Sequence, residues 1–459
     1  MSHVHLRRLG SRAGLQTIGC RLSPDHTCRT ATVLSCFPRR MFASVRWTVQ
    51  EPTSRPGAAA VQEATWRAEA GDASLGRYLQ ECRELVVREI RRIIPSASPW
   101  SAILYDLMLV YPLRAAKALR PAICIATCRA LGGRLELVLP SAAVLELYHN
   151  AFLIHDDVED LSEKRRDQST LHEAWGMPIA VNVGDAMLAL ALMPLLDNMR
   201  LVGMGKALRI LQAVAEMARE TAEGQAIELA WIRENVFDQG DDDYERMVEK
   251  KTSYYSFMTP MNIGAIAAGV ESDCVDALLK FARPLGVAFQ IQDDILNLAA
   301  DESRYGKEIA GDLWEGKHTL ILLHAIRSST PSERARAQAV LAKARPRGGK
   351  SLQALTGVEA AIDDLVREGE LSPRAEATLR ERTGRLRASV THVHKTSEDI
   401  AFLSGLIERQ GSLEYARGIA AKHGREAKVA LEALSDRLGP SVHRSFLAGL
   451  AEYVSDRDR

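Results

Sequence analysis

Apolar residues recur at helical spacing over most of the chain. From residue 76 to about 344 they form long segments rich in Ala and Leu, with few of the β-branched alternations that indicate strands. The same spacing returns at about residue 397 and continues to the end of the chain. The pattern predicts a protein that is nearly all helix.

Two segments depart from this pattern. Residues 1–50 contain eight Arg, no Lys and one acidic residue, which is typical of an organelle transit peptide. A disordered extension is an equal alternative, because Arg outnumbers Lys throughout the chain. Residues 345–395 open with a stretch containing Pro and Gly and carry many charges among sparse apolar positions. We expect a disordered or targeting-like leader and linker over 1–75, one domain over 76–459, and a charged surface insertion within it at about 345–395.

Composition excludes several classes of protein. Lys and Arg total 59 and are balanced by 59 Asp and Glu, so no net charge attracts nucleic acid. The longest apolar run, residues 186–196, is about half a bilayer span and contains Pro194. We therefore expect no nucleic-acid partner and no integral membrane segment. We expect a cytoplasmic location, or an organelle if the Arg-rich leader is a transit peptide.

The strongest chemical signal is the sequence Asp156-Asp157-Val158-Glu159-Asp160, which follows an apolar helical run. In a helix, Asp156 and Asp160 lie one turn apart on the same face with Asp157 beside them. Such carboxylates repel one another, so they form either a solvated helix face or a site for a hard cation such as Mg²⁺.

A second acidic sequence, Gln292-Asp293-Asp294-Ile295-Leu296-Asn297, follows another apolar run far along the chain. Two such clusters on helices of one bundle can face each other across a cavity and hold several Mg²⁺ ions. Arg165 and Arg166 come after the first cluster, and Lys307 and Lys317 come after the second. Carboxylates that bind metal and basic groups that bind oxygen anions are together what a diphosphate requires.

An ordered set of motifs resembles the trans-isoprenyl diphosphate (polyprenyl) synthases, in particular the geranylgeranyl diphosphate synthases. The motifs are the first aspartate cluster with Arg165-Arg166, Gly184-Asp185-Ala186, Gly224-Gln225, Lys251-Thr252-Ser253, Phe289-Gln290-Ile291-Gln292-Asp293-Asp294 and Asp312-Leu313-Trp314-Glu315-Gly316-Lys317. The resemblance covers about residues 76–344 and 396–459. It implies an all-α fold, a single large helical bundle around a central cavity, and a homodimer.

The resemblance also implies roles for individual residues. It places Mg²⁺, as three ions per active site that Mn²⁺ can replace, on Asp156, Asp157, Asp160, Asp293 and Asp294. It places the allylic diphosphate on Arg165, Lys251 and Lys307, with Lys317 as a further substrate-binding residue. It places the diphosphate of isopentenyl diphosphate on Lys117, Arg120, His149 and Arg166. The polar groups of Thr252 and Gln290 are then positioned to steady a carbocation, and Glu228 has even odds of lying near the metals.

The chain departs from the family pattern at two places. Asn297 stands where the second motif usually has a third Asp, which makes a metal-binding role for Asn297 doubtful. Ala115 and Ala116 replace two glycines before Lys117, and we expect them to favour helix there. The acidic run at residues 241–243 lies outside these motifs and is read as helix capping.

The implied activity is Mg²⁺-dependent, head-to-tail condensation of isopentenyl diphosphate with an allylic prenyl diphosphate. Bulky residues before the first motif set chain length in the family, and here Tyr148, Ala151 and Phe152 occupy those positions. They predict a short all-trans product of about C20, since Tyr148 lies ~12 Å below Asp156 on a helix. The alternatives are a farnesyl or longer-chain synthase, a regulatory subunit of a heteromeric synthase, and a class I terpene cyclase.

Overall fold

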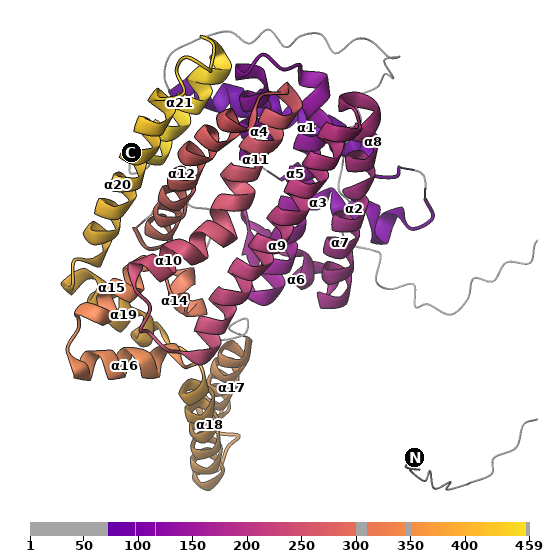
Figure 1. Cartoon of the computed structure of the whole chain (residues 1–459). Helices are drawn as coiled ribbons and strands as arrows, with labels where there is room; N and C mark the ends of the chain where they lie inside the picture. The colour runs from indigo at the N-terminus through magenta and orange to yellow at the C-terminus, as the bar shows by residue number, and fades with distance from the viewer. Residues whose placement is uncertain (1–71, 97, 115, 300–309, 346–349, 456–459) are drawn as a thin grey trace, which may run out of the picture. The chain divides into compact units, whose positions relative to one another are not determined.

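The structure, a computed structural model, is built almost wholly from helices (Figure 1). It describes residues 72–96, 98–114, 116–299, 310–345 and 350–455. The predicted all-α class is therefore confirmed. Residues 1–71 of the predicted leader, together with Ala115 and Lys307, lie outside the described residues.

Helix α5 (Leu135–Glu159) forms the centre of the larger hydrophobic core. The apolar residues that precede the first aspartate cluster in the sequence are buried, and α5 packs against α1, α4, α7, α8 and α11. A helix that is buried nearly all round needs apolar residues on every face, which explains the high proportion of Ala and Leu in this segment. The bounds of the surrounding elements are α1 (Asp72–Ile93), η1 (Ser101–Ile103), α2 (Tyr105–Met108), α3 (Val110–Leu113), α4 (Leu119–Ala130), α6 (Leu171–Trp175), α7 (Met177–Leu190), α8 (Leu192–Val202) and α11 (Thr259–Ala268).

A π-helix, η2 (Glu249–Met258), packs tightly between α9 (Met204–Glu234) and α12 (Ser272–Ala299). Glycines make this close packing possible on both sides. A Cβ atom on Gly224 of α9 would lie within 3 Å of the Lys251 backbone, and one on Gly286 of α12 would lie equally close to Ser253. Such π-helical segments occur often at functional sites, because the wider turn changes the direction of its side chains.

A second, smaller core lies beside the C-terminal half of α12. It contains Val287, Ile291 and Ile295 of α12, together with apolar residues from helices before and after α12 in the chain. Those helices are α10 (Asp241–Val248), α14 (Gly311–Glu315), α15 (Leu320–Ser328), α16 (Pro331–Leu341), α19 (Ser397–Arg409) and α20 (Ser412–Glu432), while α21 (Val442–Ser455) joins the larger core. Because α12 contributes to both cores, it fixes the second aspartate cluster relative to the first.

A short β-hairpin interrupts the helical chain directly after α5. Strands β1 (Lys164–Arg165) and β2 (Gln168–Ser169) are antiparallel and are joined by Arg166 and Asp167, which both have positive φ. Two consecutive positive φ values are the geometry of a type I′ turn. The sequence did not predict this turn, because the turn contains none of the Asn-Gly or Asp-Gly pairs that usually indicate one.

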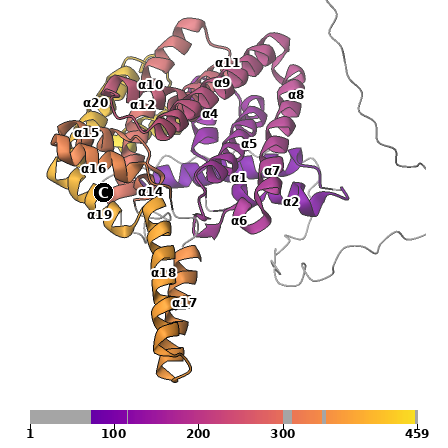
Figure 2. The ribbon, with the colours of Figure 1, turned by 90° about the horizontal axis from the view of Figure 1, so that it is seen from below.

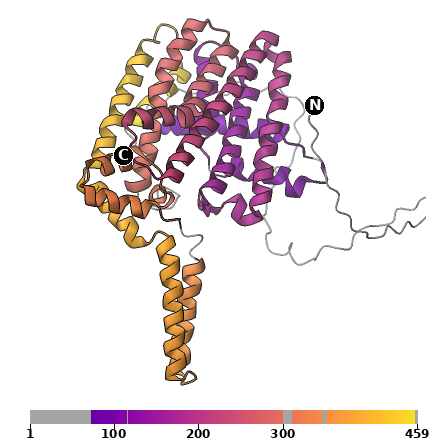
Figure 3. The ribbon, with the colours of Figure 1, turned by 60° about the horizontal axis from the view of Figure 1, so that its bottom comes forward.

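The segment expected to be a surface insertion contains two helices, α17 (Lys350–Arg367) and α18 (Pro373–Val393). They pair with each other as a hairpin that stands apart from the bundle, as Figures 1, 2 and 3 show. Ion pairs join the two helices at Arg387–Glu359 (2.5 Å) and Arg380–Asp363 (2.7 Å). The many charges of this segment are therefore explained by a hairpin that is largely exposed to solvent.

Two stretches of the described chain are long and apolar enough to cross a membrane by length and composition alone. The first is α5, of which 78% of the apolar window is buried inside the bundle. The second, residues 177–202, is 39% buried and comprises two helices, α7 and α8, that meet at Ala191. Core helices of soluble proteins pass the same test, and the absence of an integral membrane segment stays a prediction.

Candidate active site

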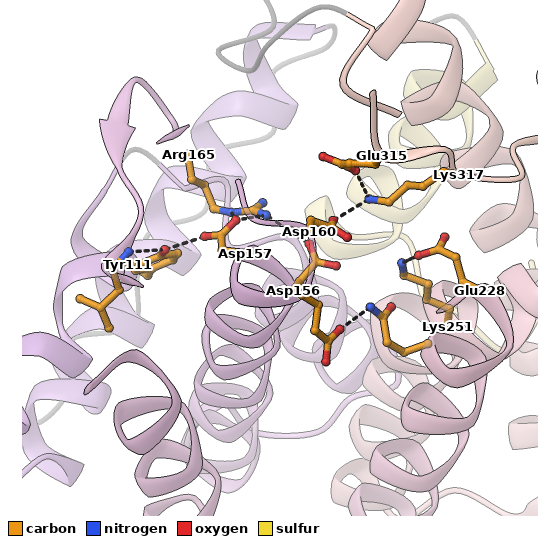
Figure 4. A network of polar contacts seen from close by, with 12 residues as sticks. Tyr111, Asp156, Asp157, Asp160, Arg165, Glu228, Lys251, Glu315 and Lys317 are labelled. Carbon is orange, nitrogen blue, oxygen red and sulfur yellow. Dashed lines mark hydrogen bonds and ion pairs between the residues drawn. The ribbon is translucent and has the colours of Figure 1, made fainter. Parts of the chain in front are cut away.

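The first aspartate cluster lies at the C-terminal end of α5 (Figure 4). Asp156 and Asp157 are in the last turn, and Asp160 is the C-cap residue. The C-terminus of a helix already carries partial negative charge, so carboxylates there are stable only beside cations. The structure places two basic side chains, Arg165 and Lys317, on this cluster.

Arg165 is the partner of the buried carboxylate in this cluster. Its guanidinium group lies 2.6 Å from Asp157 and 3.2 Å from Asp156, and both Arg165 and Asp157 are buried. Burial alone would lower the pKa of Arg165, but the attraction of Asp157 raises it above its ordinary value. Asp157 is thus paired with Arg165 and removed from water, whereas the Asp156 side chain is a quarter exposed.

Two residues that the sequence did not single out hold this arrangement. The Tyr111 hydroxyl donates to Asp157 at 2.6 Å and accepts from the backbone N–H of Leu171 at 3.1 Å. Arg114 donates to the carbonyls of Arg165 (3.1 Å) and Ser169 (2.7 Å), and so anchors the β-hairpin. No local pattern could have identified them, because their partners lie far along the chain.

Replacing Tyr111 with Phe should lower both stability and turnover. The change removes one hydrogen bond to a buried carboxylate, which is worth about 1.5–3 kcal/mol, and leaves the ring in place. Arg165 still neutralises Asp157 in the variant, so we expect turnover to fall about tenfold and not to vanish. Thermal unfolding and steady-state kinetics measure the two effects. Tyr105→Phe in α2 is the control, and equal losses in both variants would contradict the role of the Tyr111 hydroxyl.

Lys317 connects the first cluster to α14. Its ammonium group lies 2.7 Å from Asp160 and 2.8 Å from Glu315 (Figure 4). Burial raises the pKa of Asp160 to about 7 although Lys317 opposes the rise. Lys317 and Arg345 together lower the pKa of Glu315 in spite of its burial. Burial is thus the main cause of the raised pKa of Asp160, and Asp156 and Glu315 add to it.

A second lysine, Lys251 of η2, forms a hydrogen-bonded ion pair with Glu228 of α9. Burial would lower its pKa, but Glu228 and then Asp156 raise it above the ordinary value for lysine. Lys251 is thus charged and lies within the electrostatic reach of the first aspartate cluster. The sequence did not decide whether Glu228 lies near the metals, and the structure places it as the ion-pair partner of Lys251.

The second aspartate cluster lies on the C-terminal half of α12. Asp294 accepts from the Tyr244 hydroxyl at 2.6 Å and from Gln290 at 2.8 Å, and Gln290 accepts from the Thr252 hydroxyl at 2.7 Å. Burial raises the pKa of Asp294 to about 7. Thr252 and Gln290 therefore act on Asp294 as a continuous hydrogen-bonded chain, and Tyr244 completes it from α10. No sequence motif predicts this role of Tyr244, because Asp294 lies 50 residues away in the chain.

Asn297 and Asp293 differ in their surroundings. Asn297 is buried, accepts from the backbone N–H of Asp312 at 3.2 Å through its side chain, and accepts from Ala310 at 2.8 Å through its carbonyl. It therefore fixes the start of α14. Asp293 is half-buried beside Asp294.

The residues fit a divalent cation by the chemistry of their donors. Hard cations prefer carboxylate oxygens and complete their shells with water and phosphate oxygen. Asp160 already lies 2.7 Å from the Lys317 ammonium, so its carboxylate is placed beside positive charge in this structure. Within the described residues no three potential ligands gather at one point, so any ion held here needs oxygen atoms from a substrate or from water.

The basic residues expected at the second diphosphate are only partly brought together. Arg120 donates to the Tyr255 hydroxyl at 2.6 Å, and the His149 and Tyr255 rings are 6.0 Å apart. Burial lowers the pKa of Arg166, and the negative charge of Glu146 offsets part of that effect. Lys117 is exposed and instead donates to the Tyr453 hydroxyl of α21 at 2.7 Å.

The expectation of helix around Lys117 is wrong. Residues 116–118 lie outside any helix, Ala118 has a φ of +49°, and α4 begins only at Leu119. The reason is Pro121, because its ring would clash with the carbonyl of Lys117 in a continuous helix and it has no N–H to donate. The interpretation of residues 241–243 as helix capping is confirmed, since α10 begins at Asp241 and Asp243 accepts from the N-cap N–H of Gly240 at 3.0 Å.

The residues expected to limit product length form part of an aromatic group. The Tyr148 and Phe152 rings are 5.9 Å apart, and the Phe152 and Tyr255 rings are 5.7 Å apart, each pair edge to face. Ala151 and Tyr148 are buried, while Phe152 is half-buried. Because Tyr255 comes from η2, both aromatic residues of α5 contribute to one group shared with a neighbouring helix.

An all-α bundle with carboxylates on two helices and lysine and arginine beside them defines an enzyme that binds anionic substrates. A sequence profile of the polyprenyl synthetase family matches residues 102–357. The chain belongs to the polyprenyl synthetase family, and the predicted family and prenyltransferase class are confirmed.

Several relatives are about one third identical to this chain over the residues that align. The short chain isoprenyl diphosphate synthase of Methanocaldococcus jannaschii is 34% identical over 225 residues, which cover 49% of this chain and 67% of the relative. The geranylgeranyl diphosphate synthase of Methanosarcina mazei is 35% identical over 46% of this chain and 63% of its own length. The octaprenyl diphosphate synthase of Escherichia coli is 34% identical over 217 residues, which cover 47% of this chain and 64% of the relative. The chain thus matches about two thirds of the length of these relatives, whose products differ in length.

Solved structures cover more of the chain. The geranylgeranyl pyrophosphate synthetase of Pyrococcus horikoshii aligns with 84% of this chain and 99% of its own, with a TM-score of 0.65 and 26% identity. The polyprenyl synthase of Caulobacter crescentus, solved with calcium and isoprenyl diphosphate, aligns with 85% of this chain and 99% of its own, with a TM-score of 0.63 and 26% identity. The fold of the described residues is therefore the polyprenyl synthase fold.

Proposed function

We propose that the protein condenses isopentenyl diphosphate head-to-tail with an allylic prenyl diphosphate to give an all-trans product of about C20. The observation that carries the proposal is the pairing of Asp156, Asp157 and Asp160 with the buried cations Arg165 and Lys317, inside the region that matches the family. Carboxylates and cations so placed can hold a metal–diphosphate group and stabilise it as it leaves.

The reaction begins when the allylic C–O bond breaks and its electron pair passes to the diphosphate. Arg165 and Lys251 stabilise the developing negative charge on that group, because both are charged and largely removed from water. In this proposal the oxygen atoms of Thr252 and Gln290, which are hydrogen-bonded to each other at 2.7 Å, supply the negative ends of dipoles that oppose the positive charge left on the allylic carbon. Arg120, His149 and Arg166 hold the diphosphate of the second substrate, whose double bond attacks this carbon. Loss of a proton, taken up by the departing diphosphate, completes a chain longer by one isoprene unit.

Asp156, Asp160 and Asp293 are the residues that would hold a divalent cation, Mg²⁺ in this proposal, together with oxygen atoms of the substrate or of water. When bound, the cation supplies positive charge to the diphosphate oxygens and so weakens the C–O bond. The calcium and isoprenyl diphosphate in the Caulobacter crescentus structure support this part of the proposal. Asp157 and Asp294 serve mainly as partners of Arg165, Tyr244 and Gln290, and an occupancy of three ions stays part of the proposal.

Replacing Tyr148 with Ala should lengthen the product by at least one isoprene unit. Tyr148 lies two helical turns below Asp156, ~12 Å down the path of a growing tail. The Tyr148 ring is buried and packs against Phe152, so removing it opens space for a longer tail. Ala151 has a small side chain and already leaves room beside the path of the tail. Chromatography of the dephosphorylated products measures the change. An unchanged distribution in both Tyr148→Ala and Phe152→Ala would place the limit of the tail elsewhere, for example at the neighbouring helix or across a dimer interface.

We also propose a homodimer. Large apolar side chains are exposed on α7, α8 and the start of α9, among them Leu192, Met193, Leu196, Met204 and Leu208. Monomeric proteins seldom expose this much apolar surface in one region. A second copy of the chain would cover it, and this would also account for the high hydropathy of residues 177–202. Light scattering of the purified protein, compared with a Met193→Glu/Leu196→Glu variant, tests the assignment.

The test of the proposed function is incubation of the purified full chain with labelled isopentenyl diphosphate and allylic primers of different length. A prenyl diphosphate synthase incorporates the label and yields a product of defined length. A class I terpene cyclase would convert the allylic substrate without incorporating label, and an inactive regulatory subunit would convert neither. Either of these results would overturn the proposal.

A further inference from the structure

The two ends of the inserted hairpin meet beside the active site. Ala344 and His394 form a parallel bridge, and the backbone N–H of Lys395 donates to Ala344 at 2.9 Å. The Lys395 ammonium is buried and donates to the carbonyls of Lys343 (2.7 Å) and Trp314 (3.0 Å). Because Trp314 lies in α14, the base of the insertion is fastened to the helix that precedes Lys317.

The insertion also contributes a charge to this helix. The Arg345 guanidinium lies 2.5 Å from one Glu315 oxygen, and the other Glu315 oxygen lies 2.8 Å from the Lys317 ammonium. Lys317 in turn lies 2.7 Å from Asp160 (Figure 4). All four side chains are less than a fifth exposed. A continuous line of ion pairs thus runs from the first residue of the insertion to the first aspartate cluster.

The four side chains along this line carry two positive and two negative charges, because Arg345 and Lys317 alternate with Glu315 and Asp160. Without Arg345, Lys317 would be the single cation between two carboxylates, and the net charge of the group would fall from zero to −1. The positive charge that Lys317 can offer to an anion near Asp160 therefore depends on Arg345.

We infer that Arg345 is a positioning residue for the diphosphate-binding site, which acts through Glu315 to leave the charge of Lys317 available to the allylic diphosphate. The inference rests on the proposed function. In this inference the base of the insertion, at Arg345, contributes to substrate binding. The hairpin of residues 350–393 does not contribute to it. Arg345 touches neither substrate, so its loss should weaken allylic binding and leave the isopentenyl diphosphate site, at Arg120, His149 and Arg166, unaffected.

The experiment compares Arg345→Gln and Arg345→Lys with the unmodified chain. In Arg345→Gln we expect the KM for the allylic substrate to rise roughly tenfold, the size expected for one partly buried charge. The KM for isopentenyl diphosphate should stay unchanged, and Arg345→Lys should restore most of the loss because it keeps the charge. The matched control is Arg387→Gln, which removes an Arg–Glu ion pair of the same length within the hairpin and should change neither KM.

A double-mutant cycle shows whether Arg345 acts through Glu315. If it does, Arg345→Gln should have little further effect in a Glu315→Gln background, because the carboxylate that it neutralises is gone. Additive effects in the cycle, equal rises in both KM values, or failure of Arg345→Lys to restore binding would overturn the inference. Inactivity of the unmodified chain would instead count against the proposed function, so the two failures are distinguishable.

Discussion

Replacing Asp156 with Asn should reduce turnover by about 10²–10³-fold without unfolding the protein. Asp156 is the most exposed aspartate of the first cluster, and its carboxylate is 3.2 Å from Arg165 at the end of α5. Asn keeps the shape of the side chain and removes the negative charge that offsets the dehydration of a bound cation. Because the carboxylate is partly in water, we expect the unfolding temperature to stay nearly constant. Turnover and circular dichroism measure the two quantities.

The corresponding change at Asp157 is less informative. Asp157 is buried between Arg165 and Tyr111, so Asp157→Asn leaves a buried guanidinium without its counter-charge and should destabilise the protein. A double replacement of Asp156 and Asp157 would therefore mix a loss of metal binding with a loss of stability. Asp363→Asn, in the exposed hairpin, is the control for the single change. Near-normal activity in Asp156→Asn would rule out a metal site at this end of α5.

Replacing Gly224 with Ala should abolish activity by displacing Lys251. A Cβ atom at Gly224 would lie 2.4 Å from the backbone nitrogen of Lys251 and 2.7 Å from its Cα, and backbone atoms cannot move aside as a flexible side chain can. The π-helix η2 must then shift away from α9, which carries Lys251 away from Glu228 and the first aspartate cluster. We expect a loss of stability of at least about 1–3 kcal/mol, the usual cost of overpacking.

The same helix offers a matched control. Gly205, near the start of α9, has no heavy atom within 4 Å of the position that its Cβ would take. Gly205→Ala should therefore leave activity unchanged and raise stability by up to about 1 kcal/mol, since Ala is the better helix former. Thermal unfolding and turnover of the two variants make the comparison. If Gly224→Ala folds and works like Gly205→Ala, the close contact between α9 and η2 does not set the position of Lys251.

The parts of the site that sequence analysis predicted are those encoded by short spacing. The apolar period of α5 placed Asp156, Asp157 and Asp160 at one end of a helix, and the structure brings Arg165 and Lys317 to them. Each of these residues lies in a motif whose members are close together in the chain. The period of the apolar residues likewise predicted the all-α fold.

The parts that sequence analysis missed depend on contacts between distant segments. Tyr111 and Tyr244 each donate to an aspartate from another helix, across 46 and 50 residues of sequence. No local pattern distinguishes either of them from a tyrosine that only fills the core. The β-hairpin was missed because tertiary contacts, such as those of Arg114, hold Arg166 in a conformation that it does not favour by itself.

The parallel bridge between Ala344 and His394 has a consequence for engineering. Because the two ends of the hairpin are neighbours, a polypeptide whose termini lie close together can replace residues 350–393 without altering the path of α16 or α19. The position is thus a natural grafting point, where a fluorescent domain or an affinity tag adds no strain to the bundle. A graft that keeps Arg345 and Lys395 would retain both fastenings to α14.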